Sequence, residues 1–388
     1  MKPTRTGLLA GWAALALGLL WSMLAYRAGR LECAFAYLSA FGFLASTLVG
    51  VLALLTMTYV VNARWFIVLS GSGLLLVSPT LYLPLLFVPI ALALRLLYPW
   101  AGRPLLSAET LSASGQTAAL GQVWMSSGPF LIRAAVYLLV WVGIAEALRY
   151  AALAQARKRS TWLLTHRSAL SAVALPLLGL STTWASFDWL LSAVPGWNMT
   201  SAGLYVLTGG FASALGVLAV LVHFQRRSGW LPTAVGPAHS LALGRLLFAA
   251  VCLWAYIAVS QLIIVWIADL PREAAFYVPR AHAAWRHVAA LLVFGHFVVP
   301  FLLLLSRNWK QRSGFVAGLG AWLALMHAVD LYWLIQPSAR AAPSLLDLGP
   351  FLLLGALASV LVRLRSRTAP RVPLHDPELA RSLGYESP

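Results

Sequence analysis

The sequence predicts an all-α membrane protein that crosses the bilayer about ten times. Of its 388 residues, 61% are hydrophobic and only 10% are charged, whereas a soluble domain carries about 25% charged residues. The mean hydropathy is +0.81, which is more apolar surface than a soluble fold of this length can bury. The apolar runs are long and continuous, which excludes the short alternating strands of a membrane β-barrel.

A helix of about 20 apolar residues crosses a bilayer, and the chain contains ten such segments. They are predicted at 7–26, 33–60, 69–94, 128–150, 169–192, 199–223, 242–268, 284–306, 314–336 and 344–364. Pro79, Pro84 and Pro89 all fall in the third segment, so we expect that helix to be kinked. The first segment is expected to be a retained helix, because it is long for a signal peptide and no A-x-A cleavage site follows.

These spans divide the chain into one domain and a tail. Residues 1–364 are predicted to form a single transmembrane domain, 365–388 a polar tail, and 95–127 the one sizeable loop. Basic residues gather on the side that holds both termini, as at Arg157–Arg159, so both termini are predicted to be cytoplasmic. We attribute the net charge of +17 to these cytoplasmic segments, which are expected to contact anionic lipid. Nucleic acid is not an expected partner, because no soluble basic domain is present.

Metal and haem sites have little support in the sequence. Cys33 and Cys252 form no CxxC pair, so a disulfide framework, structural zinc or an Fe–S cluster is not expected. The predicted depths of His296 and His327 differ by only about 6 Å, which would allow one bis-histidine haem, but there is no second pair at a matching level. We therefore expect no haem, Fe–S cluster or metal on this chain.

Four acidic residues, Glu146, Asp188, Asp330 and Asp347, fall within or near the spans. An acid at the bilayer centre costs about 2.5–3.5 kcal/mol on insertion scales, so such groups usually pair, face the protein interior or carry protons. Asp188 and Asp330 are predicted in the outer halves of the fifth and ninth spans, and His327 shares a helix face with Asp330. The three side chains are candidates for a proton relay to the outer aqueous phase.

Structural roles for the same residues stay open. Asp188 has the position of an interfacial cap just before a Pro-Gly turn. Asp330 has a candidate ionic partner in Arg133 of the fourth span, and His327 resembles an ordinary core histidine. Glu146 is expected to pair with Arg149, one helical turn away.

Aromatic residues gather at the outer ends of the fifth and ninth spans. The group comprises Trp184, Trp189, Trp197, Tyr332 and Trp333. One interpretation is the aromatic belt at the membrane surface, and the other is a flat wall for a quinone ring. The small residues of 203–216 indicate close helix packing in the sixth span.

Several stretches, in order along the chain, are similar to one known family. "TWASFDWLLSAVPGW" at 183–197, followed by "GLYVLTGGFASALGVL" at 203–218, resembles the ActF-like, NrfD-type membrane subunit of alternative complex III. Further matches are "YVVNARW" at 59–65 and the segments 243–280, 293–310 and 329–337. The tail sequence "HDPELARSLGYES" also resembles the family's ending. The resemblance covers nearly all of the chain beyond the first helix.

The resemblance implies a subunit of a respiratory quinol:electron-acceptor (cytochrome c) oxidoreductase in the bacterial inner membrane. It implies ten helices, arranged as two four-helix bundles plus flanking helices, with no haem or Fe–S cluster on this chain. It further implies quinone binding, proton conduction towards the periplasm, or both. The implied partners are an ActC-like membrane paralogue, a periplasmic Fe–S subunit, and multihaem and monohaem c-type cytochromes.

The family's motifs carry over to Asp188 and to the block containing Asp330, Tyr332 and Trp333. With the neighbouring residues, the predicted proton pathway or quinone site comprises Asp188, Asp330, His327, Trp189, Tyr332, Trp333 and Arg133. No residue is assigned as catalytic. The chain departs from the family at Gly196, where a histidine is common, and after "ARW". The alternative hypotheses are a secondary transporter and a purely structural membrane anchor of the complex.

Overall fold

The computed structural model describes residues 5–101, 123–158, 161–194, 197, 199–232, 234–282, 284–366, 376 and 378–386. These residues are mainly helical, with no strand among them. Within the same described residues, ten segments are long and apolar enough to cross a membrane. The predicted fold class, an all-α polytopic membrane protein, is therefore confirmed.

The spans begin and end close to the predicted residues. Their helices are α1 (Arg5–Ala28), α2 (Arg30–Val60), α4 (Ser70–Leu76) with η1 (Ser78–Tyr82) and α5 (Leu83–Leu92), α9 (Ser127–Lys158), α10 (Thr161–Ala185) with η2 (Ser186–Leu190), α11 (Ala202–Arg227), α12 (Pro237–Ala268), α15 (Trp285–Leu291) with η4 (Leu292–Val298) and α16 (Val299–Leu305), α18 (Ser313–Ile335), and α19 (Leu348–Arg365). Shorter elements connect them: α3 (Arg64–Ile67), α6 (Leu94–Leu97), η3 (Leu191–Ala193), α13 (Pro271–Ala274), α14 (Val278–Ala281), α17 (Arg307–Gln311), η5 (Gln336–Ser338), η6 (Leu345–Asp347) and α20 (Leu379–Leu383).

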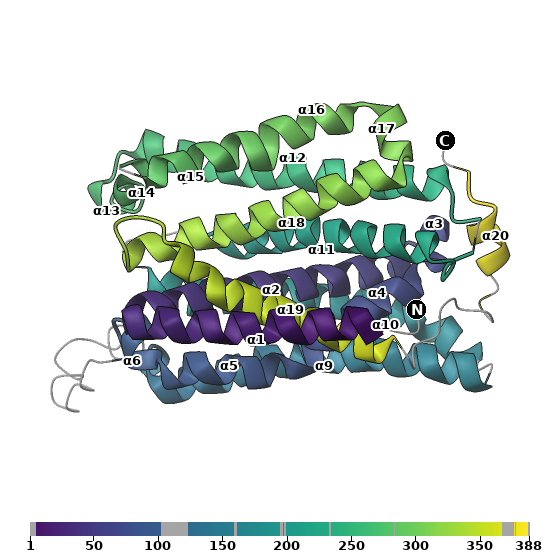
Figure 1. Cartoon of the computed structure of the whole chain (residues 1–388), viewed down its shortest axis with the longest axis horizontal. Helices are drawn as coiled ribbons and strands as arrows, with labels where there is room; N and C mark the ends of the chain where they lie inside the picture. Colours follow the sequence, from purple (N-terminus) through teal and green to yellow (C-terminus); the bar gives the residue numbers. More distant parts are fainter. Residues whose placement is uncertain are drawn as a thin grey trace.

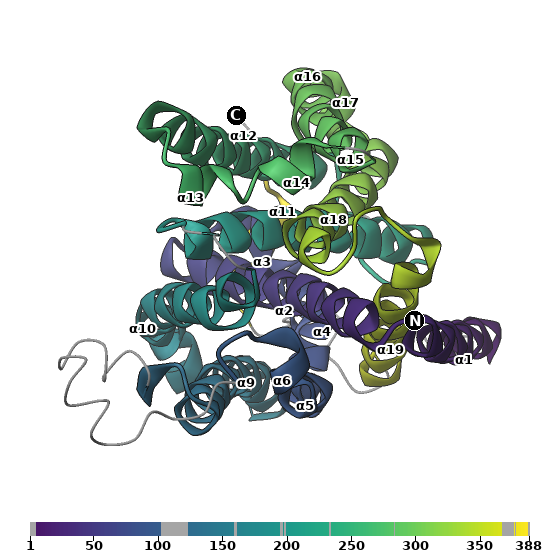
Figure 2. The ribbon, with the colours of Figure 1, turned by 90° about the vertical axis from the view of Figure 1, so that its left-hand side faces the viewer.

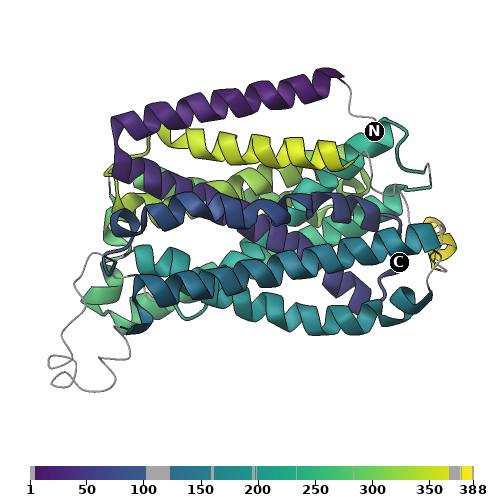
Figure 3. The same cartoon turned by 90° about the horizontal axis from the view of Figure 1, so that it is seen from below.

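Eight of the spans form two groups of four. The first bundle contains α2, the broken span α4–α5, α9 and α10, and the second contains α11, α12, the span α15–α16, and α18. Figure 2 shows the second bundle above the first, with α2 and α11 at the boundary between them. The helices α1 and α19 pack against each other as an outer pair, which Figure 3 shows in purple and yellow.

Both chain ends lie at one end of the bundle. Figure 1 places the start of α1, α17 and α20 at this end, which we call the termini end, and α6, α13 and α14 at the opposite end. The described part of the tail includes α20, which packs against α3. Arg167 of α10 pairs with Asp376, and Ser382 accepts a hydrogen bond from the backbone N–H of Val68 (3.1 Å). Residues 367–375, also within the predicted tail, lie outside the described residues, as do 102–122 of the predicted loop.

Helix α2 forms the centre of the molecule. Its sequence is mainly apolar on every face, which is typical of a helix buried on all sides, and 21 of its 31 residues are buried, all within 35–58. By contrast, α1 leaves most of its side chains uncovered by the chain, Leu9 and Leu20 among them. In a membrane protein such apolar side chains face lipid or another subunit.

Three spans depart from a regular α-helix, and in two of them the irregular turn carries a polar residue. The third span is interrupted near Pro79 and Pro84, because proline cannot donate a helical hydrogen bond, whereas Pro89 lies within α5. The fifth and eighth spans contain π-helical turns at η2 and η4. Each π-helical turn carries a polar side chain, Asp188 in η2 and His296 in η4. Such turns are frequent at functional sites.

Glycines bring the central helices into backbone contact. Gly50 of α2 lies against Gly210 of α11, and Gly216 of α11 lies against Gly320 of α18. A Cβ atom at position 320 would lie 2.7 Å from the Gly216 Cα atom. No flexible side chain is available there to give way, so the fit requires glycine.

We expect Gly320→Ala to destabilise the protein by about 1–3 kcal/mol, because the helices must separate to admit the methyl group. Gly318→Ala, two residues away on the same helix, is the matched control, because a Cβ atom there meets nothing within 4 Å. Thermal unfolding in detergent should show a lower midpoint for Gly320→Ala only. Equal midpoints for the two variants would contradict the close approach of α11 and α18.

Candidate functional site

Asp188 is held by an ionic network with the fourth span. Arg133 of α9 donates from Nε to Asp188 Oδ2 (2.8 Å) and from Nη2 to Oδ1 (2.8 Å). The Tyr137 hydroxyl, one turn further along α9, donates to Oδ2 (2.9 Å). The carboxylate is 2% exposed, and the bidentate geometry is the strongest that an arginine and a carboxylate form.

Arg133 is itself fixed by Trp124. Its Nη1 atom donates to the Trp124 carbonyl (2.8 Å), and its guanidinium lies 4.3 Å from the centre of the Trp124 ring. Arg133 had been a candidate partner of Asp330, and the structure pairs it with Asp188 instead. This geometry favours a structural role for Asp188, because protonation of its carboxyl would break the ion pair.

Trp189, next to Asp188, points into the first bundle. Its side chain is 3% exposed and packs against the rings of Phe41, Phe87 and Trp141. The ring therefore belongs to the core, whereas Trp184, which is 47% exposed, suits the predicted aromatic belt.

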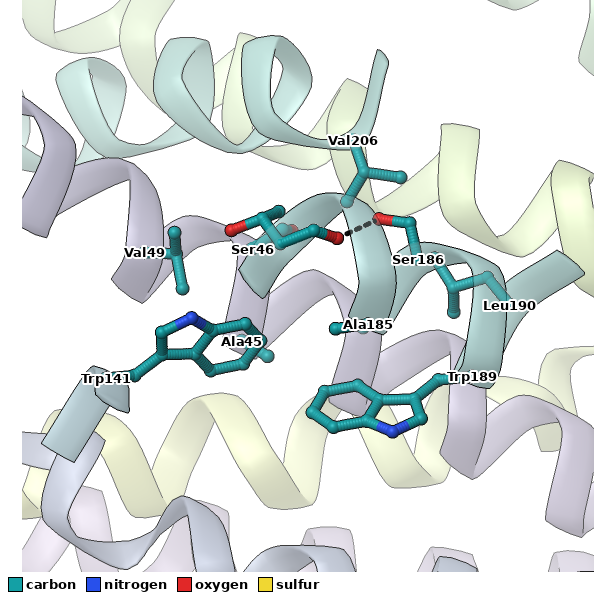
Figure 4. Close-up of a pocket in the computed structure, with 11 residues that line it drawn as sticks. Ala45, Ser46, Val49, Trp141, Ala185, Ser186, Trp189, Leu190 and Val206 are labelled. Atoms are coloured by element: carbon teal, nitrogen blue, oxygen red, sulfur yellow. Dashed lines mark hydrogen bonds between the residues drawn. The ribbon is translucent and has the colours of Figure 1, made fainter. Parts of the chain in front are cut away.

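A small cavity adjoins Trp189. Its volume is about 20 Å³, which is room for about one water molecule. Figure 4 shows Trp141 and Trp189 on one side of it and Ser46 and Ser186 on the other. The dashed line in the figure is the hydrogen bond that Ser186 Oγ donates to the Thr182 carbonyl (2.7 Å).

Asp330 of α18 lies in a different environment, inside the second bundle. Its carboxylate accepts hydrogen bonds from the Tyr205 hydroxyl (2.6 Å) and from Trp254 Nε1 (3.1 Å). The residue is 0% exposed. Among the described residues, no basic side chain lies within ion-pair distance of it. Asp330 is thus a buried carboxyl group with two neutral donors and no compensating cation.

Two buried histidines flank Asp330. His327 shares a hydrogen bond between Nε2 and Ser46 Oγ of α2 (2.8 Å), and its Nδ1 atom, against Gly209, has no partner. The ring of His296 stacks on that of Trp254 with centres 3.8 Å apart, and neither of its nitrogens has a partner. We call Ser46, Tyr205, Trp254, His296, His327 and Asp330 the Asp330 cluster.

The Asp330 cluster extends from the middle of the core, at Ser46, Trp254 and His296, towards the opposite end, where Tyr205 lies. Thr47, which follows Ser46 on α2, shares a hydrogen bond with Ser213 of α11 (2.9 Å). From there towards the termini end, α2 carries only apolar residues over 48–55, a length of about 12 Å. The next buried polar pair, Ser72 and Gln225, lies beyond this apolar layer.

Tyr332 and Trp333 belong to a third group at the opposite end. The Tyr332 hydroxyl donates to Asp347 Oδ2 (2.7 Å), and Arg340 lies 3.8 Å from the same carboxylate. Trp333 packs beside Arg280, which is 2% exposed and donates to the carbonyls of Trp333 (3.1 Å) and Leu334 at the end of α18. Burial lowers the pKa of Arg280 to about 9, so its charge persists at neutral pH and complements this helix terminus.

The structure thus distributes the predicted site residues among three places. Asp188, Arg133 and Trp189 lie together in the first bundle, Asp330 and His327 in the second, and Tyr332 with Trp333 near Asp347 and Arg280. Gly196 lies outside the described residues. Sequence analysis missed Tyr205 and Trp254 and considered His296 only as a haem ligand. In the sequence, these three residues are marked only as polar or aromatic residues within apolar spans.

The described residues contain no group of three or more His, Cys, Asp or Glu side chains that could hold a metal ion. The predictions of no haem and no Fe–S cluster remain predictions. In comparisons with known proteins, no family model matches the chain, and no curated protein matches it. The family resemblance therefore enters below as a proposal.

Proposed function

We propose that this chain is a membrane subunit of a respiratory quinol:electron-acceptor oxidoreductase, and that its Asp330 cluster passes protons released by quinol oxidation. The sequence resemblance supports the choice of complex. The observation that carries the proton-handling role is the buried Asp330 carboxyl group, which has two neutral hydrogen-bond donors and no cation beside it.

A carboxyl group without an ionic partner is suited to changing its protonation state. Protonation of Asp188 would break its pair with Arg133, whereas protonation of Asp330 would break no ion pair. The unpartnered nitrogens of His296 and His327 provide further proton positions in the same buried cluster. Ionisable groups inside a membrane domain are costly, and they commonly mark proton relays.

The direction of proton movement follows from the polar and apolar halves of the core. A second polar group, with Tyr332, Asp347 and Arg280, lies at the opposite end, while residues 48–55 of α2, between the Asp330 cluster and the termini end, are all apolar. The positive-inside rule assigns the termini end to the cytoplasm. Protons would therefore leave on the periplasmic side, where quinol oxidation contributes to the membrane potential.

The electron-transferring groups are proposed to reside on partner subunits. These are an ActC-like membrane paralogue, a periplasmic Fe–S subunit and c-type cytochromes. The quinol supplies two electrons to the partners and two protons to the relay.

A structural anchor is the second candidate. Its support is that the Asp188 carboxylate forms an ion pair with Arg133 and accepts hydrogen bonds from Arg133 and Tyr137. In that case the embedded acids would hold helices together and would have no part in turnover.

Purification from native membranes tests the proposed complex. The tagged chain, extracted in mild detergent, should co-purify with a larger membrane paralogue and an Fe–S protein, and the preparation should show a c-type haem spectrum. It should also reduce cytochrome c with added quinol. A colourless preparation of this chain alone, under conditions that keep a known respiratory complex intact, would refute the assignment.

A further inference from the structure

The π-helical turn η4 lacks one backbone hydrogen bond that its own geometry requires. In such a turn each backbone N–H donates to the carbonyl five residues earlier, and the Val299 N–H donates to the Phe294 carbonyl in this way. The next donor in the series would be residue 300, which is proline and has no N–H. The Gly295 carbonyl therefore has no backbone donor, because Val299 already serves Phe294 and Pro300 cannot donate.

Trp322 of α18 supplies the missing donor. Its Nε1–H donates to the Gly295 carbonyl at 2.7 Å. The fit around Gly295 is close, since an added Cβ atom there would lie 3.2 Å from Trp322 Cζ2 and 3.0 Å from Met326 Sδ. A carbonyl without a donor is costly inside a membrane, where no water replaces the missing hydrogen bond. The indole thus compensates for the proline.

The same contact bears on His296, which follows Gly295 in the turn. The His296 ring is fully buried and stacks on Trp254, with ring centres 3.8 Å apart. Among the described residues, neither of its nitrogens has a hydrogen-bond partner. The ring is therefore placed by the backbone of η4 and by packing. Trp254 in turn donates to Asp330 (3.1 Å), so His296 stacks on a ring that contacts the acid.

We propose that Trp322 is a positioning residue for the Asp330 cluster. By its hydrogen bond to the Gly295 carbonyl, it keeps η4 in the π-helical form that stacks the His296 ring on Trp254. Trp322 belongs to α18, which also carries Asp330, so one helix holds both the acid and the side chain that fixes the facing histidine. The consequence for proton transfer rests on the proposed function, whereas the placement of the ring does not.

NMR of the full-length protein in lipid bilayers, with isotope-labelled histidine, tests this placement. Stacking on an aromatic ring shifts the His296 ring signals upfield, and His296→Gln identifies these signals among the eight histidines by their loss. Trp322→Phe removes the N–H donor and should move them towards the values of an unstacked histidine. Replacement of Trp322 by benzothienylalanine, which keeps the bicyclic shape but has sulfur in place of the N–H, should move them in the same direction.

Pro300→Ala provides the rescue. It restores a backbone N–H that can reach the Gly295 carbonyl, so adding it to Trp322→Phe should return the His296 signals to their native positions. Trp141→Phe is the matched control, because it removes another buried indole donor (2.9 Å) in the first bundle and should leave the signals unchanged. Unmoved signals in Trp322→Phe would overturn the proposal. A shift that Pro300→Ala fails to reverse would also overturn it, as would an equal shift in Trp141→Phe.

Turnover of the intact complex separates this inference from the proposed function. Trp322→Phe should lower quinol oxidation about tenfold, because a displaced proton position slows transfer without removing it, and Pro300→Ala should restore the rate. If the His296 signals shift and recover while Asp330→Asn turns over at the native rate, the positioning role is correct and the proposed function is wrong. If the signals stay in place while Asp330→Asn is slow, the proposed function is correct and this inference is wrong.

Discussion

Asp330→Asn is expected to lower quinol oxidation by the intact complex about 100-fold, the contribution typical of a positioned proton-transfer group. Asparagine has nearly the same shape as aspartate and can still accept the Tyr205 hydrogen bond, but it cannot take up a proton at neutral pH. The measurement is steady-state cytochrome c reduction by quinol, with subunit composition checked on the same preparation.

Glu146→Gln is the control for this prediction. It also neutralises one embedded acid, but Glu146 is 40% exposed and, among the described residues, its ionic partner is Arg149 on its own helix. Its turnover should match the native protein. If Asp330→Asn assembles fully and turns over at the native rate, the proton-handling role of the cluster is wrong and the structural anchor is the better account.

Arg133→Met is expected to destabilise the protein by about 3–5 kcal/mol, because it leaves the Asp188 carboxylate buried without a counter-charge. Asp188 is 2% exposed, and Tyr137 alone cannot replace two charged hydrogen bonds. Adding Asp188→Asn to Arg133→Met removes the uncompensated charge and should recover most of the loss. Equilibrium unfolding in mixed detergent measures all three proteins.

A pair whose acid is more exposed provides the comparison for this second result: Glu146 is 40% exposed and Asp188 is 2% exposed. Arg149→Met breaks the Glu146 pair and should cost about 1 kcal/mol or less, since the Glu146 carboxylate that is left behind is 40% exposed and can be hydrated. If Arg133→Met costs no more than Arg149→Met, the Arg133–Asp188 pair does not stabilise the first bundle. A large loss that Asp188→Asn fails to recover would indicate that Arg133 acts mainly through Trp124.

The spans could be predicted from sequence because apolar length alone determines which segments fit a bilayer. The break in the third span was also predictable, since Pro79 and Pro84, in the first turns of η1 and α5, cannot donate helical hydrogen bonds whatever surrounds them. The Glu146–Arg149 pair was predictable because residues three apart lie one turn apart on the same face of a helix. Each of these features depends on residues close together in the chain.

Contacts between spans could not be predicted in this way. Arg133 and Asp188 are 55 residues apart, and Tyr205 and Asp330 are 125 apart. Which side of each helix faces its neighbour depends on packing of small residues such as Gly216 and Gly320, and a helix that is apolar all round gives no periodic signal. This explains why Arg133 was considered for Asp330 rather than for Asp188.

The π-helical turns added a second obstacle. A π-helical turn inserts an extra residue into the hydrogen-bond pattern, so the 3.6-residue period no longer tells which way Asp188, Trp189 or His296 points. Trp189 was thus assigned to either the membrane surface or a quinone wall, and the structure places it in the core. The sequence also could not show that His296 stacks on Trp254 or that neither of its ring nitrogens has a hydrogen-bond partner.

The most direct test of the account is redox-induced infrared difference spectroscopy of the purified complex, native and Asp330→Asn. Quinol oxidation should change the C=O stretching band of a protonated carboxyl group, the band should shift in D₂O, and Asp330→Asn should abolish it. Persistence of the same band in an assembled Asp330→Asn complex would show that another group carries the proton, which would contradict the central claim.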